Sequence, residues 1–418
     1  MSLLRPLGRR EADASPCSPG ARGAPFPPLA PRGRGAGGEG PALRLGLVCF
    51  NPLPRHLDTP YQLPLGGSES ALCYLAEALA RRGHPVFVFH PGPTPAASRG
   101  VSCLPLTEPG LRQAGPLDAV LVLNLAGHAR ALRPLLGRDT LLVLWNQHHW
   151  DQPAVQPLRD PAERAAYDGF ALVSDWQRQE FLQHFGLDPQ LTGVRRNGIA
   201  PAVAALFPEA AALGDSPRRL PVLAYTSTPY RGLDLLLEAF PRIRAAVPEA
   251  TLKVFSGMGV YQIPAAEDQA RFGALYQRCR EMDGVEYVGS LAQPELAAEL
   301  AQAAVLAYPN TYPETSCIAV LEALAAGRTV VTSARAALPE TSAGFALLVP
   351  IDGDRDTYRD RFVAETVRAL TERTGPDQAA LVEHLGRQLA HVRQHHTWPV
   401  LADECVGWLC RLRATAAR

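Results

Sequence analysis

Residues 312–327 read YPETSCIAVLEALAAG and place two glutamates, Glu314 and Glu322, in a segment that is otherwise almost free of charge. The preceding run, AVLAYPN at residues 304–310, is short and apolar, which favours a buried strand. A stripe of apolar residues at helical spacing follows it: Ile318, Leu321, Leu324 and Ala325. The stretch therefore predicts a strand, a loop that carries Glu314, and a helix that carries Glu322.

The ends of this helix indicate a ligand. Thr315 or Ser316 is a good N-cap, and Gly327 is a typical residue just after a helix end. Open α/β sheets bind ligands at the carboxyl ends of their strands, and a helix amino terminus there favours a phosphate. We therefore expect Glu314 to bind sugar hydroxyls and Glu322 to reach a ribose. The amides expected to face a diphosphate are those of Thr315, Ser316 and Cys317. The alternative is a solvated helix with scattered acids.

Short apolar runs alternate with helical stretches along most of the chain. Runs that are apolar throughout are typical of strands covered by helices on both faces. They are LRLGLVCF, HPVFVFH, DAVLVLNL, TLLVLW and ALVSD in the first half, and PVLAYTS, TLKVFSG, VEYVG, AVLAYPN and RTVVTSA in the second. The pattern predicts an α/β protein with parallel, doubly wound sheets.

Two similar halves divide the chain into predicted domains. We expect a first domain over residues 42–205 and a second over residues 206–390, because the turn-rich segment 195–219 separates the two series of strands. Residues 391–418 predict a helical segment that closes the chain. Residues 1–41 are rich in Pro, Gly, Ala and Arg and lack apolar periodicity, so they predict a disordered tail.

The composition sets limits on the class of protein. The 418 residues include 41 Lys plus Arg and 41 Asp plus Glu, so no excess of charge indicates nucleic acid as a partner. No apolar run is long enough to span a membrane, and we expect a cytoplasmic protein. The eight cysteines form no CxxC pair and have no histidines at zinc spacing, which predicts buried thiols in a reducing compartment.

The spacing Glu314-x7-Glu322 followed by Ala-Leu-Ala-Ala-Gly resembles the E-x7-E motif of retaining GT-B glycosyltransferases, especially glycosyltransferase family 4 (glycosyl transferases group 1). The resemblance covers residues 43 to about 390. It implies two Rossmann-like domains across a cleft, with the last helix crossing back onto the first domain. It also implies an enzyme of the hexosyltransferase type (EC 2.4) that moves a sugar from a nucleoside diphosphate sugar to a hydroxyl acceptor, with retention and without a metal or other cofactor.

The glycines of Leu65-Gly66-Gly67-Ser68-Glu69-Ser70 precede a predicted helix, so the backbone there can approach an anion closely. Ser70 stands where a G-x-S-x-G nucleophile elbow needs its last glycine, so we do not expect an elbow. The alternative is an ordinary tight turn. Similarity to the glycine-rich loop of family 4 favours a diphosphate contact at Gly67.

The segment Ser227-Thr228-Pro229-Tyr230-Arg231-Gly232 follows the first strand of the second half. Family 4 enzymes usually carry an arginine near Ser227 and a lysine before the glycine, and both hold the donor diphosphate. Here Arg231 alone keeps a cation, and its forked guanidinium suits phosphate oxygens. We expect Arg231 and Ser227 to bind the donor. The alternative for Arg231 is a solvated position on a capped helix.

Two further signals are weaker. His148 and His149 follow the run TLLVLW, and a histidine at this place in family 4 contacts the donor sugar. We favour His148 over His149 for the contact with the donor sugar. His148 and Glu314 are the two candidate catalytic residues. The strand and turn VEYVGSL, which contain Gly289, resemble the segment that binds the nucleotide base through its backbone.

Three alternatives stay open: a GT-B nucleotide-sugar epimerase, a non-catalytic GT-B scaffold, and a dinucleotide-dependent oxidoreductase. The missing cation at Ser227 supports the scaffold, whereas the absence of a G-x-G-x-x-G motif argues against the oxidoreductase. The sequence leaves open the donor base and sugar, the hydroxyl acceptor, a peripheral membrane contact and the oligomeric state.

Overall fold

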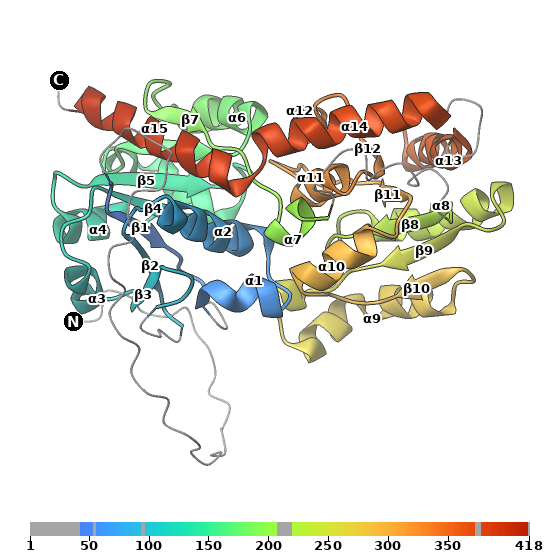
Figure 1. Ribbon diagram of the computed structural model, residues 1–418, viewed down its shortest axis with the longest axis horizontal. Coiled ribbons are helices and arrows are strands. Elements are labelled where there is room, and N and C mark those ends of the chain that lie inside the picture. The colour runs from blue at the N-terminus through green and yellow to red at the C-terminus, as the bar shows by residue number, and fades with distance from the viewer. Residues whose placement is uncertain (1–41, 53–55, 93–96, 207–219, 373–377, 417–418) are drawn as a thin grey trace, which may run out of the picture.

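The computed structural model describes residues 42–416 apart from 53–55, 93–96, 207–219 and 373–377 (Figure 1). The predicted tail at residues 1–41 lies outside the described residues, as do residues 207–219 of the turn-rich segment 195–219.

The first sheet contains parallel strands in the order β3-β2-β1-β4-β5-β6-β7 (Figure 1). The strands are β1 (Leu45–Val48), β2 (Val86–His90), β3 (Ser102–Pro105), β4 (Ala119–Leu123), β5 (Leu141–Asn146), β6 (Gly169–Leu172) and β7 (Thr192–Val194). The α-helices of this part are α1 (Thr59–Gln62), α2 (Gly67–Arg81), α3 (Glu108–Gln113), α4 (Ala129–Leu136), α5 (Pro161–Arg164), α6 (Asp175–Phe185) and α7 (Pro201–Ala204). The 3-10 helices are η1 (His56–Asp58) and η2 (Pro153–Arg159).

Alternate residues of these strands enter two separate hydrophobic cores. In β4, Leu121 packs in the core that also holds the residues of α2, whereas Val120 and Val122 pack in the core under α3 and α4. Successive side chains of a strand point to opposite faces, so a strand covered on both sides must be apolar throughout. This is why the runs in the sequence show no polar alternation.

The second sheet is also parallel, in the order β10-β9-β8-β11-β12-β13. Its strands are β8 (Val222–Tyr225), β9 (Thr251–Val254), β10 (Val285–Tyr287), β11 (Val305–Tyr308), β12 (Thr329–Ser333) and β13 (Leu347–Val349). The helices around it are α8 (Leu233–Ala246), η5 (Gly259–Tyr261), α9 (Ala265–Glu281), α10 (Gln293–Leu300), α11 (Ile318–Ala325), α12 (Leu338–Ser342), α13 (Arg355–Glu372) and α14 (Gln378–His395). The predicted α/β class with two parallel, doubly wound sheets is confirmed.

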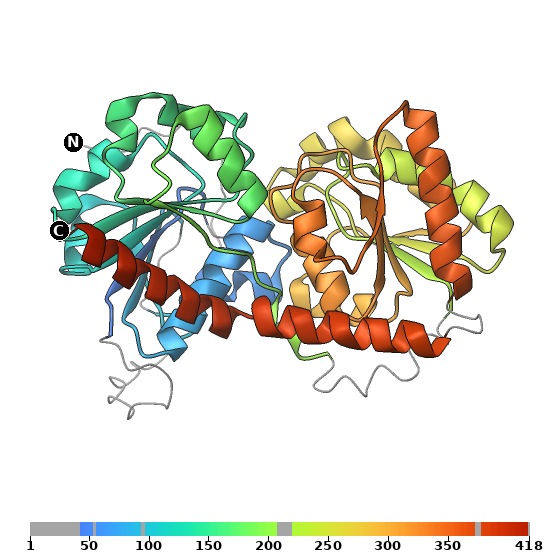
Figure 2. The same ribbon diagram turned by 90° about the horizontal axis from the view of Figure 1, so that it is seen from above.

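Two helices near the end of the chain connect the halves. In Figure 2, α14 and α15 (Trp398–Ala416), coloured orange-red to dark red, follow each other along one side of both sheets. Helix α14 packs on α11 of the second half, and α15 packs on α2 of the first. Close packing of α15 relies on small residues, because a Cβ added at Gly193 in β7 would lie 2.7 Å from the indole Nε1 of Trp408. Helix α7, within the predicted first domain, contacts α10 and α11 of the second half.

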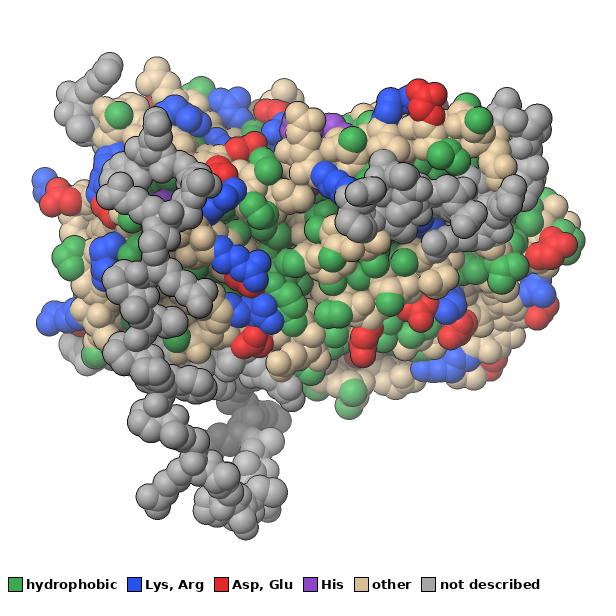
Figure 3. Space-filling model, in the orientation of Figure 1, with side chains coloured by type: hydrophobic (Ala, Val, Ile, Leu, Met, Phe, Trp, Pro, Cys, Tyr) green, Lys and Arg blue, Asp and Glu red, His purple; other side chains and the backbone are tan. Residues whose placement is uncertain are grey.

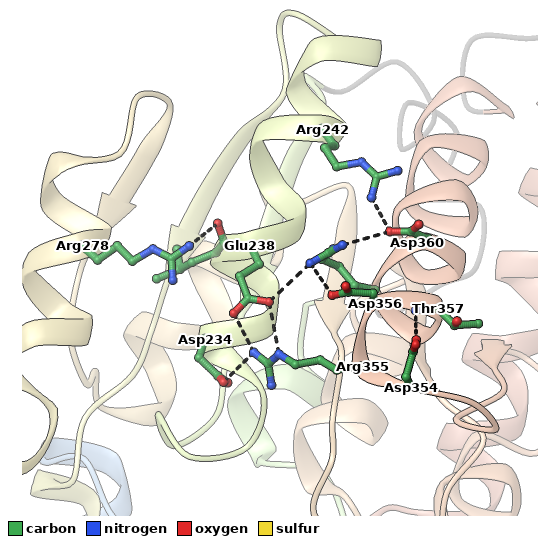
Figure 4. Close-up of polar contacts among 11 residues, drawn as sticks. Asp234, Glu238, Arg242, Arg278, Asp354, Arg355, Asp356, Thr357 and Asp360 are labelled. Atoms are coloured by element: carbon green, nitrogen blue, oxygen red, sulfur yellow. Dashed lines mark hydrogen bonds and ion pairs between the residues drawn. The ribbon is translucent and has the colours of Figure 1, made fainter.

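Polar contacts fix α13 against α8 on the outer side of the second half (Figure 4). Arg355 at the start of α13 donates to Asp234 at 2.8 Å and to Glu238 at 2.9 Å, both on α8. Arg242, further along α8, pairs with Asp360 of α13. These side chains are between a third and a half exposed, so each pair adds little stability, but the pairs fix the register of the two helices.

The surface agrees with the balanced composition. On the face shown in Figure 3, Arg and Lys side chains are interspersed with Asp and Glu. None of the helices in the described part of the chain is long and apolar enough to cross a membrane. The cysteines in the described part are free thiols, and six are buried as expected, but Cys410 is exposed because it faces outward on α15.

Candidate active site

A cleft of about 370 Å³ is lined by residues of both halves. It lies at the carboxyl ends of the strands, since its walls include the segments after β1, β5, β8 and β11. Nine of the ten predicted site residues line it: Gly67, His148, Ser227, Arg231, Glu314, Thr315, Ser316, Cys317 and Glu322. The volume falls in the range of small-molecule sites.

Gly289 is the predicted site residue that is not among those lining the cleft, so the expected base contact there stays a prediction. The amide of Gly289 donates to the carbonyl of Val254 at 3.4 Å, and its φ of 86° turns the chain away from β10. The next residues, Ser290 and Leu291, line the cleft instead.

Arg231 and Glu314 form an ion pair at the centre of the cleft. Arg231 Nη1 lies 2.8 Å from Glu314 Oε1, and the Tyr308 hydroxyl donates to the same oxygen at 2.5 Å. Glu314 is 6% exposed and Arg231 is 20% exposed. Burial is the largest single effect and would lower the pKa of Arg231, but the Glu314 charge and the neighbouring tyrosine hydroxyls together raise the pKa well above the ordinary value. The guanidinium therefore keeps its charge, and its buried Nε has no partner.

Hydroxyl groups surround the place where family 4 enzymes usually carry a first cation. Ser227 lies between Thr226 and Thr228, and all three line the cleft. The buried hydroxyls of Thr226 and Thr228 have no hydrogen-bond partner in the protein. Unpartnered buried polar atoms are rare and costly, so several of them in one cleft indicate a polar ligand.

Two helix amino termini meet across the cleft. Helix α2 begins at Gly67, and α11 begins at Ile318. A Cβ added at Gly67 would lie 3.0 Å from Ile318 Cδ1, so the two ends are in contact. Both ends carry free amides and the positive pole of a helix dipole, which favours an anion between them.

The start of α11 differs from the prediction by one or two residues. The N-cap is Cys317, without a side-chain hydrogen bond, and not Thr315 or Ser316. The Thr315 hydroxyl instead donates to the carbonyl of Gln147 at 2.6 Å, which connects the two halves across the cleft. The helix ends as expected, with Gly327 after the last turn at a φ of 64°.

Both predicted histidines line the cleft. Burial, and then the charge of Arg231, lower the pKa of His148, so its imidazole is neutral at pH 7. Nδ1 is buried without a hydrogen-bond partner in both His148 and His149, but His149 Nδ1 lies 2.7 Å from the Asp151 carboxylate. His148 is therefore the histidine whose unpartnered ring nitrogen has no carboxylate pairing with it.

Glu322 is buried on α11 at 3% exposure and accepts a hydrogen bond from the Ala200 amide at 3.2 Å. Burial raises its pKa from the ordinary value of 4.5 to about 7, although the Ala200 amide acts in the opposite direction. The folded state thus holds this proton to a higher pH than the unfolded chain does.

We expect Glu322→Gln to change how stability depends on pH. Between pH 4.5 and 7 the unfolded chain loses this proton first, so the free energy of unfolding of the natural protein falls as pH rises. Glutamine carries no such charge, so the variant should be more stable at pH 8 by up to about 3 kcal/mol and little changed at pH 4.5. Urea unfolding at both values measures the difference. Glu383→Gln, at a 72% exposed position of α14, is the control, and an equal effect of both variants would contradict this account.

Several cleft residues were missed at the sequence level. Glu69, in the first turn of α2, is buried at 9% and accepts from the Asn51 side chain at 2.9 Å. Gln147 accepts from Asn197 at 3.2 Å, and its own Nε2 has no partner. Tyr308 supports Glu314. Glu69 could have been found from its place two residues after Gly67 in the first turn of the predicted helix, whereas the sequence pattern does not distinguish Tyr308 from the apolar residues of its strand. Among the described residues, no group of three or more His, Cys, Asp or Glu is arranged to hold a metal ion.

Comparisons with known proteins agree with this geometry. The family model described as glycosyl transferases group 1 matches residues 220–370. Among curated proteins, the chain is similar to D-inositol 3-phosphate glycosyltransferase of Streptomyces bingchenggensis, at 26% identity over 250 residues. The match covers 56% of this chain and 53% of that protein, so the chain spans about half the length of this relative.

Solved structures share the architecture over most of the chain. Sucrose-phosphate synthase of Thermosynechococcus elongatus has a TM-score of 0.64 at 18% identity, covering 89% of this chain and 100% of that one. A glycosyltransferase of Rickettsia africae gives 0.67 at 11% identity, covering 89% and 98%. Anabaena HepE in complex with UDP-glucose gives 0.59 at 15% identity, covering 88% and 100%. At these identities the likeness concerns the fold, and the predicted GT-B fold is confirmed.

Proposed function

We propose, from the match of residues 220–370 to the glycosyl transferases group 1 model and from the geometry of the cleft, that the chain transfers a sugar from a nucleoside diphosphate sugar to a hydroxyl acceptor with retention of configuration. The observation that carries the proposal is the meeting of Arg231, the amino termini of α2 and α11, and Glu314 in one cleft. This combination fits a diphosphate with a sugar attached to it.

The donor would occupy the cleft as follows. Its diphosphate would lie between Arg231, Ser227, the Gly67 amide and the amides of residues 315–317. Glu314 and His148 would hold the sugar hydroxyls, and Glu322 the ribose. UDP-glucose is bound by the Anabaena protein of the same fold, which supports a donor of this class.

The chemical step would be a substitution at the anomeric carbon of the donor. The bond from that carbon to the diphosphate oxygen breaks, and a bond to the acceptor oxygen forms on the same face of the sugar. The acceptor proton passes to the departing diphosphate oxygen, so that charge and atoms balance. Most of the barrier lies in the departing charge, and fixed donors aimed at that charge lower it. Arg231 and the two helix ends would supply this stabilisation without a metal ion.

We expect one nucleoside diphosphate to raise the melting temperature in the presence of EDTA. A panel of UDP, GDP, ADP and dTDP, with NAD as control, tests this. A ligand that binds only the folded state at a concentration of 100 times its Kd raises the free energy of unfolding by about 2.7 kcal/mol. Transfer from the matching sugar nucleotide is then followed by NMR of the anomeric proton of the product.

Each outcome of this panel separates the alternatives. Stabilisation and transfer with an unchanged anomer support the proposal, whereas an inverted anomer contradicts retention. Conversion of the donor sugar into its epimer without an acceptor would favour the epimerase. Stabilisation without any turnover would favour the scaffold. A response to NAD alone would overturn the assignment.

A further inference from the structure

The side of the cleft that belongs to the first half is rich in neutral amides. Besides Glu69 and the two histidines, the amide side chains lining it are Asn51, Asn124, Gln147 and Gln152. Each amide has both a donor and an acceptor, so a group of them matches hydroxyls, which also donate and accept. Gln147 Nε2 is buried without a partner and is therefore available to a ligand.

The charge of the cleft is acidic. Among its described lining residues, Arg231 is the cation that is always charged, and it already pairs with Glu314. Glu69 and Glu322 also line the cleft, and Glu322 carries its charge only above its raised pKa of about 7. His149 lies beside the Asp151 carboxylate, so this pair adds no net positive charge to the cleft. Arginine and lysine are the side chains that give a phosphate ester a charged partner, and Arg231, like the two helix amino termini, would be engaged by the donor diphosphate. Among the described lining residues, a second phosphate would face carboxylates without a further cation.

Exposed tyrosines lie at the cleft on the opposite side. Tyr230 is 39% exposed and Tyr261 is 41% exposed, and both line the cleft. A Cβ added at Gly66 would lie 3.0 Å from Tyr261 Cε1, so this ring reaches across to the glycine loop of the first half. An aromatic ring with one open face offers an apolar platform for the C–H face of a sugar ring.

We infer that the acceptor is a neutral polyhydroxylated molecule, a sugar or polyol that carries no phosphate group. The amides of the first half bind its hydroxyls, Tyr261 packs on its apolar face, and the acidic cleft excludes phosphate esters. This inference rests on the proposed function, because it concerns the second substrate of the same transfer.

The test compares acceptors that differ only in a phosphate group. The pairs are glucose with glucose 6-phosphate, fructose with fructose 6-phosphate, and inositol with inositol 3-phosphate, the last chosen because the curated relative is named for it. All are assayed with the full chain, the same saturating donor and EDTA. In every pair of which at least one member serves as an acceptor, we expect kcat/KM for the neutral member to exceed that for its phosphate at least ten-fold.

A charge variant tests the cause of the preference. Gln152 is half-buried, and its side chain donates to Asp151 at 3.2 Å. Gln152→Arg adds a cation to the acceptor side and should shift the ratio of the two kcat/KM values at least ten-fold toward the phosphate. Gln152→Met, which is uncharged and similar in length, is the matched control and should leave the ratio unchanged.

The outcomes separate this inference from the proposed function. Nucleotide stabilisation with a preference for the phosphorylated members, or with transfer to no neutral member, would overturn the acceptor class and leave donor binding standing. Equal shifts in Gln152→Arg and Gln152→Met would overturn the electrostatic cause. No stabilisation by any nucleoside diphosphate would overturn both proposals.

Discussion

Replacing Arg231 by methionine is expected to lower kcat for sugar transfer about 1,000-fold, as loss of a group aimed at developing charge does in other enzymes. Arg231 is the described lining residue whose charge would meet the departing diphosphate. The ion pair with Glu314 holds it in place before the donor arrives, which removes the cost of orienting it during the reaction. Methionine keeps the apolar stem of the side chain and removes the charged guanidinium.

The same substitution leaves Glu314 buried without its partner, so lost stability must be separated from lost chemistry. The double variant Arg231→Met with Glu314→Gln removes both charges and should recover stability but not kcat. Arg242→Met is the matched control, because Arg242 pairs with Asp360 on the surface of the second half (Figure 4). Near-natural kcat in a folded Arg231→Met protein would show that the helix ends alone stabilise the leaving group.

Gly232→Ala is expected to destabilise the second half by about 3 kcal/mol or more, as the sum of left-handed backbone strain and overpacking. Gly232 precedes α8 at a φ of 101°, and a Cβ built there would lie 2.2 Å from the carbonyl oxygen of Pro309. That carbonyl belongs to the backbone just after β11, so it cannot move aside as a flexible side chain could. The shift would also displace Arg231, so the nucleotide should bind more weakly.

Gly289→Ala provides the control for this prediction. Gly289 also has a positive φ, 86°, but no heavy atom lies within 4 Å of the added Cβ. Its cost is therefore limited to backbone strain, on the order of 1–2 kcal/mol. Urea unfolding of both variants measures the difference. Equal losses of stability would show that the contact with Pro309 is relieved by small movements and that strain alone matters.

The fold was predicted from runs that are apolar on both faces, and the missing strands show the limit of that signal. The three strands not predicted, β3, β7 and β13, all lie at an edge of a sheet. All three are short and only partly buried, so solvent permits polar or small residues in β3 and β7, whereas β13 (LLV) keeps an apolar run and was overlooked. The fourth edge strand, β10, was predicted from the run VEYVG.

Site residues that belong to a sequence motif could be predicted. Their hydrogen-bond and ion-pair partners could not, because these come from distant parts of the chain. Glu314 and Arg231 were each recognised, but their ion pair joins residues 83 positions apart. The support from Tyr308 depends on a hydroxyl at the end of a buried strand, which hydrophobic periodicity does not distinguish from another core residue. The raised pKa of Glu322 depends on burial against the segment at Ala200, which no local pattern indicates.

The crossing of α15 onto α2 has a consequence for how the protein is made. Arg82 at the end of α2 donates to Asp403 of α15 at 2.6 Å across 321 positions, and Trp398, Leu401 and Leu412 are buried in the shared core. Each large apolar side chain of this kind contributes about 1.5–3 kcal/mol when it is buried. The ribosome synthesises the first half of the chain long before it synthesises α15, the helix that covers α2. The nascent first half therefore keeps an uncovered apolar surface throughout synthesis of the second, and a chaperone has that interval in which to bind it.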